Sequence, residues 1–546
     1  MNRVSSIPRG GWTLLLMAVF AAAFALRLKG IGFGLPALND PDELMFELGA
    51  LRMLRGLTLN PGWFGHPATT TMYVLAVVNT AVFLVGQLAG WFPTVGDFAD
   101  AIYADPSWFI LPGRIAMLLC ALGTIWQTYR LGSELFDRGI GLAAAVLLAV
   151  NPLHVAYSQI IRSDMMACLL MLLCLRAALR IARKDAWRDY VLASFWLGLA
   201  IATKWPFAVS ALGVAAAVGL RMANDPANRK RTMVRCVLFG AMGIGFLLLA
   251  SPYILLDYPT VVRNLHGEAQ LYHLGATGGT PWENAWWYLR GSILTGFGWA
   301  GMALLVFGSA LLARRREALA IIAPVVIVFS LLICSQNLVW DRWVLPLMPL
   351  FAIIAALALA RLGAIALSAM PRPVGGALMA GALAITLLPL GIAAQANGRI
   401  RLNDTRQQAS VWARAHLPSG STVLIEHFAF DLLPQPWHFL FPLGDAGCAD
   451  VKAYLHGKVG YATIDASRGT RANVDYGTVA PDKRQTCRAD YAILTQYDRY
   501  RVERQLFPTE YTAYQALLAQ GEIMATFAPR PGESTGPIVR IVRFRN

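Results

Sequence analysis

Acidic residues gather at the start of one amphipathic segment, where they could serve either structure or chemistry. In the run LPALNDPDELMFELGALRMLRG, Asp40 can cap a helix that has Pro41 at its first position and Glu43 three residues after the cap. The leucines that follow stand at helical spacing with charges between them, which predicts a helix lying in a membrane interface. Capping explains Asp40 and Glu43 but leaves Asp42 unexplained. At such an apolar boundary, a group transfer involving a lipid substrate would need a general base.

A second set of charged residues stands where apolar runs begin or end. The cations are Arg114, Arg162, Lys204 and Arg342, and Asp164 stands two residues after Arg162. Taken singly, each cation is explained as an interfacial anchor and Asp164 as a helix cap. Taken together, cations at the level of lipid headgroups are what an anionic lipid phosphate or diphosphate would need.

Histidines on two loops could join this site. His66 precedes Pro67, and a residue before proline is held extended, which would aim the imidazole from its loop toward the acidic segment. A lone histidine is more often structural, so this role stays open. The loop from 257 to 287 holds His266, Glu268 and His273, which are ligand types for a metal ion. Their spacing matches no fixed metal motif, so a divalent ion as cofactor stays an open hypothesis.

Composition indicates which elements must position these residues. Of the 546 residues, 56% are hydrophobic and 14% are charged, against roughly 45–50% and about 25% in soluble domains. The apolar residues come in runs of about 20, each long enough to cross a hydrocarbon core of roughly 30 Å. This excludes an ordinary soluble enzyme and predicts an all-α polytopic membrane protein. The runs fall near residues 12–28, 68–90, 109–130, 139–157, 165–182, 189–203, 205–221, 235–256, 286–312, 317–335, 343–361 and 374–394.

The charges divide the chain into two parts, residues 1–398 and residues 399–546. The second part holds 32 charged residues in 148, whereas the first holds 47 in 398. Of the net charge of +15, the second part has 18 basic and 14 acidic residues (+4), which leaves +11 for the membrane part. Basic residues beside membrane segments set topology, so the positive charge is no sign of nucleic-acid binding. An uncleaved first helix is favoured over a cleaved signal because Arg27 and Lys29 directly follow the apolar stretch that ends at Leu26.

Basic clusters in short loops predict the topology, because such loops remain in the cytoplasm. The strongest clusters fall within 180–188, 221–235 and 314–316, each separated from the next by two apolar runs. This places 158–164 and the first loop, 29–108, outside. The run 68–90 then cannot cross, and we expect it to lie along or re-enter from the outer face. Eleven crossings follow, with the N-terminus inside and the tail outside; a model in which 68–90 crosses and a neighbouring run is partial remains the alternative.

The tail predicts a small α/β domain outside the membrane. The runs STVLIE, YAILT, EIMATFA and IVRIVRF are typical of strands, and PTEYTAYQALLAQG of a helix. Asp404 can cap a further helix that ends before the turn at 418–420. Cys448 and Cys487 are the tail's two cysteines, and an oxidising compartment would favour a disulfide between them over two free thiols.

An ordered set of segments resembles the C-type (GT-C) membrane glycosyltransferases. NDPDELMFELGALRML, GHPATTTMYVLA, LPGRIAMLLCALGTIWQTYRLGSELF, NPLHVAYSQIIRSDMMACLLMLL, GLAIATKWPFAV and DRWVLPLMPLFAIIAA stand in the order seen in the branch that contains protein O-mannosyltransferases and lipid A aminoarabinose transferases. The resemblance covers roughly residues 10–395. It implies a GT-C fold and an inverting glycosyl transfer from a polyprenyl-phosphate sugar to an acceptor glycan, lipid or protein. It also implies the inner membrane of a bacterium, with the α/β domain in the periplasm.

The resemblance also implies roles for individual residues. By position, Asp42 is the catalytic base, Glu43 its acidic neighbour and Asp164 the carboxylate of the second outer loop. Arg114 and Arg342 resemble arginines that approach the donor phosphate.

The chain departs from both branches of that family around His66. His66 and Pro67 resemble the start of the mannosyltransferase HPP motif, but Ala68 replaces the second proline. In the aminoarabinose branch, a Glu-Lys pair stands where Gly65 and His66 stand here. This difference argues against the zinc site and the substrate of that branch in this chain.

A multi-spanning secondary transporter with an outer domain is the main alternative from another class. About twelve apolar runs is a common number for transporters, but these generally show paired repeats and polar groups near the bilayer midplane. No repeat relates the two halves, and the acidic residues cluster at one face. A membrane sensor or scaffold would need neither the DPDE segment nor its cationic counterparts.

Overall fold

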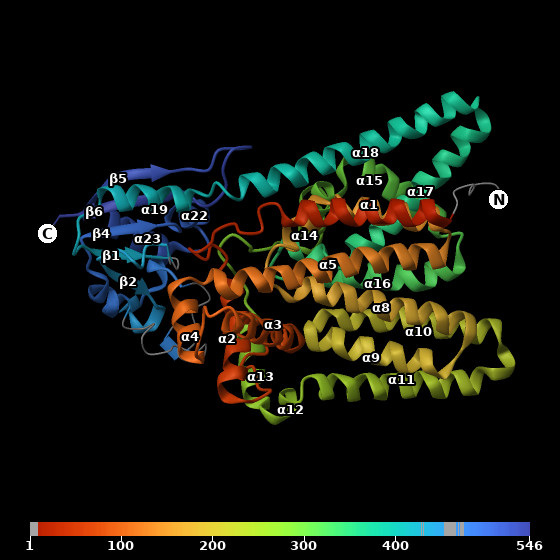
Figure 1. Cartoon of the computed structure of the whole chain (residues 1–546), viewed down its shortest axis with the longest axis horizontal. Helices are drawn as coiled ribbons and strands as arrows, with labels where there is room; N and C mark the ends of the chain where they lie inside the picture. The colour runs from red at the N-terminus through yellow and green to blue at the C-terminus, as the bar shows by residue number, and fades with distance from the viewer. Residues whose placement is uncertain are drawn as a thin grey trace.

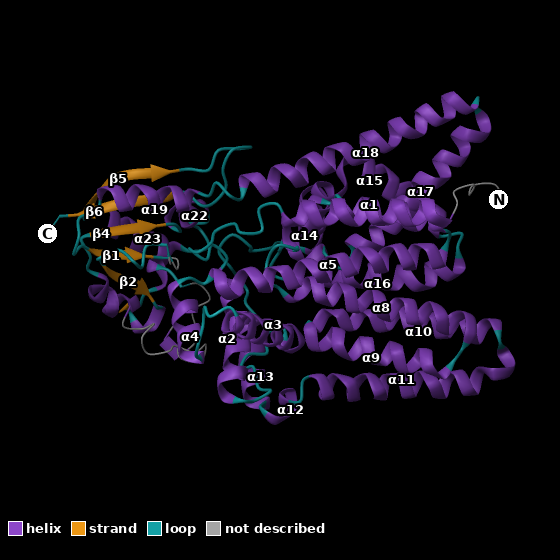
Figure 2. Cartoon of the chain, in the orientation of Figure 1, coloured by secondary structure: helices purple, strands orange, loops and turns teal. Residues whose placement is uncertain are grey.

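The computed structural model describes residues 9–426, 429, 431–452, 466–467, 469 and 474–545. Long helices lie side by side along one direction, and a sheet with its own helices stands beyond one end of this bundle (Figure 1). Helices make up the bundle, whereas all strands of the described residues belong to the second part (Figure 2). The end of the bundle that faces the sheet is called the domain end below.

Long helices of the described residues make up the bundle, and each apolar run in the sequence except 68–90 corresponds to one of them. The bundle helices are α1 (Arg9–Leu28), α5 (Ser107–Leu135), α6 (Arg138–Ala149), α8 (Ser163–Lys184), α9 (Trp187–Thr203), α10 (Ser210–Asn224), α11 (Arg229–Ala250), α15 (Leu294–Leu312), α16 (Arg316–Cys334), α17 (Met348–Ala369) and α18 (Arg372–Ile400). By length and composition, ten helices of the described residues could cross a membrane; these include α3, while α6 and α9 are too short to qualify. The chain is a multi-pass membrane protein.

Small residues bring the bundle helices close together. A Cβ atom at Gly132 of α5 would stand 3.1 Å from the Cα atom of Gly141 in α6, and one at Gly308 of α15 would stand 2.1 Å from the carbonyl oxygen of Ile354 in α17. Close backbone approach maximises van der Waals contact, which drives helix association in lipid where no hydrophobic force acts between helices. The most buried helix, α8, packs against α5, α9 and α10.

Short helices cover the domain end. They are α2 (Pro41–Gly56), α4 (Val95–Ala104), α7 (Pro152–Tyr157), α12 (Tyr253–Leu256), α13 (Tyr258–Glu268) and α14 (Pro281–Tyr288). Asp40 caps α2 by accepting a hydrogen bond from the amide of Asp42 at 3.1 Å. The expected capping box is not formed, because Glu43 turns instead to Arg114.

The helix α3 (Thr69–Leu88) lies across the bundle and is seen nearly end-on in Figure 1. Its first turn is bonded to the domain end, where the Thr70 hydroxyl lies 2.5 Å from that of Thr203. Its middle is bonded to α2, because Asn79 donates to Glu47 at 2.7 Å. Its last turn packs against Phe92, which precedes α4. Both ends of α3 therefore stay at the domain end, the arrangement expected of a segment that does not cross.

The second part is a six-stranded sheet with helices. The strands are β1 (Thr422–Ile425), β2 (His438–Pro442), β3 (Cys448–Asp450), β4 (Tyr491–Leu494), β5 (Gly521–Phe527) and β6 (Val539–Phe544), and the helices are α19 (Thr405–His416), α22 (Tyr497–Val502) and α23 (Pro508–Leu518). The sheet order is β3-β2-β1-β4-β6-β5, with β1 parallel to β2 and β4 and the other pairs antiparallel. The four predicted strands and both predicted helices are confirmed, whereas β2 and β3 were not foreseen. Cys448 and Cys487 form the expected disulfide, with Cα atoms 5.0 Å apart.

Candidate active site

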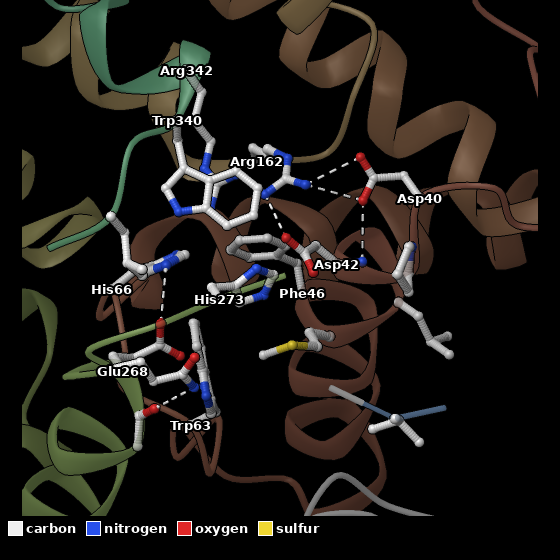
Figure 3. Close-up of a pocket in the computed structure, with 18 of the residues that line it drawn as sticks. Asp40, Asp42, Phe46, Trp63, His66, Arg162, Glu268, His273, Trp340 and Arg342 are labelled. Carbon is white, nitrogen blue, oxygen red and sulfur yellow. Dashed lines mark hydrogen bonds and ion pairs between the residues drawn. The ribbon is translucent and has the colours of Figure 1, made fainter. Parts of the chain in front are cut away.

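A cavity of about 1480 Å³ opens at the domain end. Its walls come from α2, the His66 loop, the starts or ends of several bundle helices, the loop after α13 and the carboxyl ends of strands β1 and β4. The sequence candidates that line it are Asp42, His66, Arg162, Asp164, Lys204, Glu268, His273 and Arg342. Residues more than 250 positions apart in the chain thus share one chamber, as Figure 3 shows for most of them.

Asp42 and Asp40 hold Arg162 between them (Figure 3). Arg162 donates from Nη1 to Asp42 Oδ2 at 2.6 Å and from Nη2 to both oxygens of Asp40 at 3.1 and 3.2 Å. The Arg162 side chain is 10% exposed, whereas that of Asp42 is 42% exposed toward the cavity. No hydrogen bond from the described residues reaches the second oxygen of Asp42, so Oδ1 is open to a substrate.

The pKa of Asp42 reflects two opposed effects. Burial raises the pKa of this carboxyl, but the guanidinium groups of Arg162 and Arg342 outweigh burial and hold the pKa well below its usual range. Asp42 therefore carries its negative charge throughout the physiological pH range.

A second ion pair and an unpaired guanidinium stand beside Asp42. Lys204 donates to Asp164 Oδ1 at 2.6 Å, and both side chains are at least nine-tenths buried. Arg342 is 8% exposed, stacks on Trp340 at 4.2 Å and has no carboxylate of the described residues within ion-pair distance. Its Nε atom is buried without a hydrogen-bond partner. A buried cation in this state is suited to an anionic ligand.

His66 reaches the cavity because its loop pairs with the end of α9. The amide of Trp205 donates to the carbonyl oxygen of His66 at 2.8 Å, and the amide of Ala68 donates to Thr203 at 3.1 Å. Burial, with the charges of Lys204 and Arg342, lowers the pKa of His66 to about 3. The imidazole is therefore neutral, with one nitrogen that donates and one that accepts.

Comparisons with known proteins agree with this architecture. The model of a family described as dolichyl-phosphate-mannose-protein mannosyltransferase matches residues 105–255, just over a quarter of the chain. ArnT from Cupriavidus metallidurans in the apo state is 16% identical over 98% of both chains, with a TM-score of 0.56. The same protein bound to undecaprenyl phosphate is 14% identical over 98% of both chains, with a TM-score of 0.52.

An archaeal structure has the same fold. The oligosaccharyltransferase AglB from Archaeoglobus fulgidus, in complex with an inhibitory peptide and a dolichol-phosphate, is 12% identical with a TM-score of 0.52. The alignment covers 96% of this chain and 74% of AglB. No curated protein sequence matches the chain. The chain has the GT-C membrane glycosyltransferase fold. The fold class predicted from the sequence is confirmed.

Two expected site residues lie outside the cavity of this GT-C fold. Arg114 donates to both oxygens of Glu43, at 2.8 and 2.6 Å, and to the carbonyl oxygens of Ile31 and Phe33. Both side chains of this pair are fully buried. Successive helical residues point about 100° apart, so Glu43 faces inward where Asp42 faces the cavity. Glu43 and Arg114 hold α2 on α5, which corrects the expected catalytic role of Glu43 and the donor-phosphate role of Arg114.

The expected metal ligands do not form a cluster of three in the described residues. His266 is exposed on α13, whereas His273 stacks edge-on against Trp340 with ring centroids 5.0 Å apart. Glu268 lies 4.0 Å from His66 Nε2. Within the described ranges no three His, Cys, Asp or Glu side chains are arranged to hold a metal ion. A metal site at His266, Glu268 and His273 therefore stays an open hypothesis.

Other residues of the site were missed in the sequence. Asp40 was assigned only a capping role, yet it shares Arg162 with Asp42. Trp340 precedes Asp341 and Arg342 in the sequence, and an aromatic ring beside a candidate arginine was a usable signal for a stacked guanidinium. Arg406 and Arg499 line the cavity from the second part of the chain, and nothing in the sequence links them to the membrane residues.

Proposed function

We propose that the protein is an inverting glycosyltransferase that moves a sugar from a polyprenyl-phosphate donor to an acceptor hydroxyl. The observation that carries this proposal is an ionised carboxylate, Asp42, in one chamber with a buried arginine, Arg342, that lacks a carboxylate partner. The carboxylate suits an acceptor hydroxyl, and the arginine suits the lipid phosphate that leaves.

The reaction forms one bond and breaks one bond at the anomeric carbon. The acceptor hydroxyl donates a hydrogen bond to Asp42, and its oxygen bonds to the anomeric carbon from the face opposite the phosphate. The bond between the anomeric carbon and the phosphate oxygen breaks, and its electron pair stays on the lipid phosphate. The hydroxyl proton passes to Asp42 and from there to water. Arg342 stabilises the charge that develops on the phosphate, a type of effect that usually contributes most to catalysis.

The remaining polar residues would position the two substrates. The neutral His66 ring is suited to a hydroxyl group of the sugar or acceptor, because it can donate one hydrogen bond and accept another. The Lys204–Asp164 pair lies beside Arg342 and adds a cation at the phosphate, with Asp164 holding the ammonium group in place. Arg162 fixes the orientation of Asp42.

The donor class is supported by the relatives with bound lipids. The structure of ArnT contains undecaprenyl phosphate, and that of AglB contains a dolichol-phosphate. We propose that the domain end faces outward from a bacterial inner membrane, since the disulfide between Cys448 and Cys487 is typical of an oxidising compartment.

The decisive experiment replaces the carboxylate without changing its shape. In purified protein supplied with polyprenyl-phosphate sugars, Asp42→Asn should lower kcat by about 10² to 10⁴-fold, with normal expression and thermal unfolding. Asp100→Asn is the control, because Asp100 is an exposed acid on α4 at the same end of the molecule. Retained turnover in Asp42→Asn would reject Asp42 as the base.

A lipid analysis tests the donor independently. Mass spectrometry of lipids that copurify with the protein should detect a polyprenyl phosphate or its sugar conjugate, and Arg342→Gln should reduce the amount bound. Transport of a solute without any sugar transfer would overturn the proposal in favour of a secondary transporter.

A further inference from the structure

The helix α19 of the second part is bonded directly to the residue that precedes Asp40. Asn39 donates from Nδ2 to Gln407 Oε1 at 2.8 Å and accepts at Oδ1 from Gln407 Nε2 at 2.9 Å. Arg406 donates to the carbonyl oxygen of Asn39 at 2.7 Å. Asn39 is 7% exposed, so these three hydrogen bonds are shielded from water.

The space around Asn39 leaves its side chain little freedom. Gly34 has a positive φ of 66°, and a Cβ atom there would stand 2.6 Å from the Asn39 side chain. The loop thus closes tightly on Asn39 from one side while Gln407 holds it from the other. The amide pair fixes the path of the chain at the point where it enters α2.

Asn39 is one residue away from the carboxylates. Asp40 caps α2 through the amide of Asp42 at 3.1 Å and holds Arg162 through two hydrogen bonds. Arg162 in turn donates to Asp42 at 2.6 Å. A shift of Asn39 would therefore move Asp40 and, through Arg162, change the contact that holds Asp42.

The other end of this chain of contacts is anchored in the second part. Arg406 makes a two-point ion pair with Asp404, at 2.9 and 2.8 Å, and Asp404 caps α19. The amide of Thr405 donates to the carbonyl oxygen of Thr535 at 2.9 Å. The start of α19, with Arg406 and Gln407, is thus bonded to the loop between β5 and β6.

We propose that Gln407 and Arg406 are positioning residues for the Asp40–Asp42 carboxylates and act through Asn39. The inference rests on the proposed glycosyl transfer, because it assigns the second part of the chain a role in setting the geometry of that reaction. Catalytic geometry tolerates only small errors, so support from a helix outside the membrane bundle would be required for full activity.

The test compares two neighbouring glutamines of α19. Gln407→Ala should lower kcat by between about tenfold and about a hundredfold. It should also move the acid limb of the pH profile of kcat/KM to higher pH, because Arg162 then holds Asp42 less closely. Gln408→Ala is the matched control, since Gln408 bonds to Asn403 within the same part of the chain. If Gln407→Ala matches Gln408→Ala in its pH profile, or if it changes only thermal unfolding, the proposal is wrong.

An independent measurement does not need activity. Amide hydrogen exchange of residues 38–46 should be faster in Gln407→Ala than in wild type and unchanged in Gln408→Ala, because the cap of α2 loosens. Unchanged exchange would overturn the positioning role even if the enzyme is active. Absence of transfer in wild type with every polyprenyl-phosphate sugar would instead count against the proposed function, whatever the exchange result.

Discussion

Asp42 lies in a protein cavity yet keeps its charge, and the reason is the arrangement of its neighbours. Burial alone would raise the pKa of the carboxyl group, but Arg162 lies at hydrogen-bond distance and the positive charge of Arg342 also lowers that pKa. An ionised carboxylate with one free oxygen can accept a hydrogen bond at once from an incoming hydroxyl. Its low pKa makes it a modest base, so its contribution is greatest late in the reaction, when the hydroxyl proton has become acidic.

The role of Arg162 predicts a specific pH dependence. The wild-type pKa of Asp42 is depressed, so activity should persist as the pH falls below the ordinary range of an aspartate. Arg162→Gln removes the nearer of the two cations while burial remains, so the pKa of Asp42 should rise and the acid limb of kcat/KM should move to higher pH. Arg263→Gln is the control, because Arg263 is exposed on α13. Identical acid limbs in the two variants would show that Arg162 does not set the charge of Asp42.

The pKa of Glu47 is raised, whereas that of Asp42 is lowered. Glu47 is fully buried, and burial raises its pKa well above the ordinary value despite a hydrogen bond from Asn79. A carboxyl group with a raised folded-state pKa stabilises the fold at low pH and loses that effect as the pH rises through the folded-state value. Glu47→Gln should therefore unfold at a higher temperature than wild type at alkaline pH and leave activity unchanged.

Truncation at the same position should destabilise the protein. Glu47→Ala leaves the buried Asn79 amide unsatisfied, which costs about 1–3 kcal/mol of unfolding free energy. The unfolding temperatures of Glu47→Gln and Glu47→Ala, measured over a range of pH values, test both predictions. A stability loss in Glu47→Gln as large as that in Glu47→Ala would mean that Glu47 is ionised.

The polar residues of the site could be found from sequence, but their orientation could not. Residue type and position beside apolar runs led to Asp42, Arg162, Lys204 and Arg342, all of which line the cavity. The direction of Arg114 depends on the path of a distant loop whose carbonyl groups it binds, and the sequence carries no signal for that path.

At the level of elements, α2 lines the cavity together with the ends of the bundle helices, and α3 packs behind α2. Hydropathy alone would count α3 as a membrane crossing, since it is 20 residues long and apolar. The charge pattern of the loops predicts that α3 does not cross, and the hydrogen bond from Asn79 to Glu47 of α2 agrees with a helix held at the domain end. The short strands β2 and β3 could not be foreseen, because neither shows an alternating pattern and their pairing is long-range.

Accessibility measurements can test the placement of α3. Single cysteines at Leu59 and Leu88, introduced after removal of the five free cysteines, should both react with a membrane-impermeant thiol reagent from the same side. Leu59 is 58% exposed and Leu88 is 90% exposed, so both positions are reachable. A cysteine at Arg315, in the loop between α15 and α16, should react only from the other side. Reaction of Leu59 and Leu88 from opposite sides would mean that α3 crosses the membrane.

At the scale of the whole molecule, the two parts of the chain complete one chamber. The membrane part, including α2, supplies Asp42, Asp164 and the cations beside them, and the second part supplies a wall that includes Phe441, Leu443 and Ala449. These residues lie on or beside β2 and β3, the strands nearest the disulfide. The integrity of the wall therefore depends on the bond between Cys448 and Cys487.

Removal of the disulfide should loosen this wall and lower activity together with stability. The cysteines are 39 residues apart, and closure of a loop of that length contributes roughly 4 kcal/mol in the chain-entropy account. Cys448→Ser should lower the unfolding temperature of the second part and reduce transfer, while Cys334→Ser, at a free cysteine of α16, should change neither. Alkylation followed by mass analysis should modify Cys448 and Cys487 only after reduction. Alkylation of both without reductant would show free thiols. The proposal that the domain end lies in an oxidising compartment would then rest on the charge pattern of the loops alone.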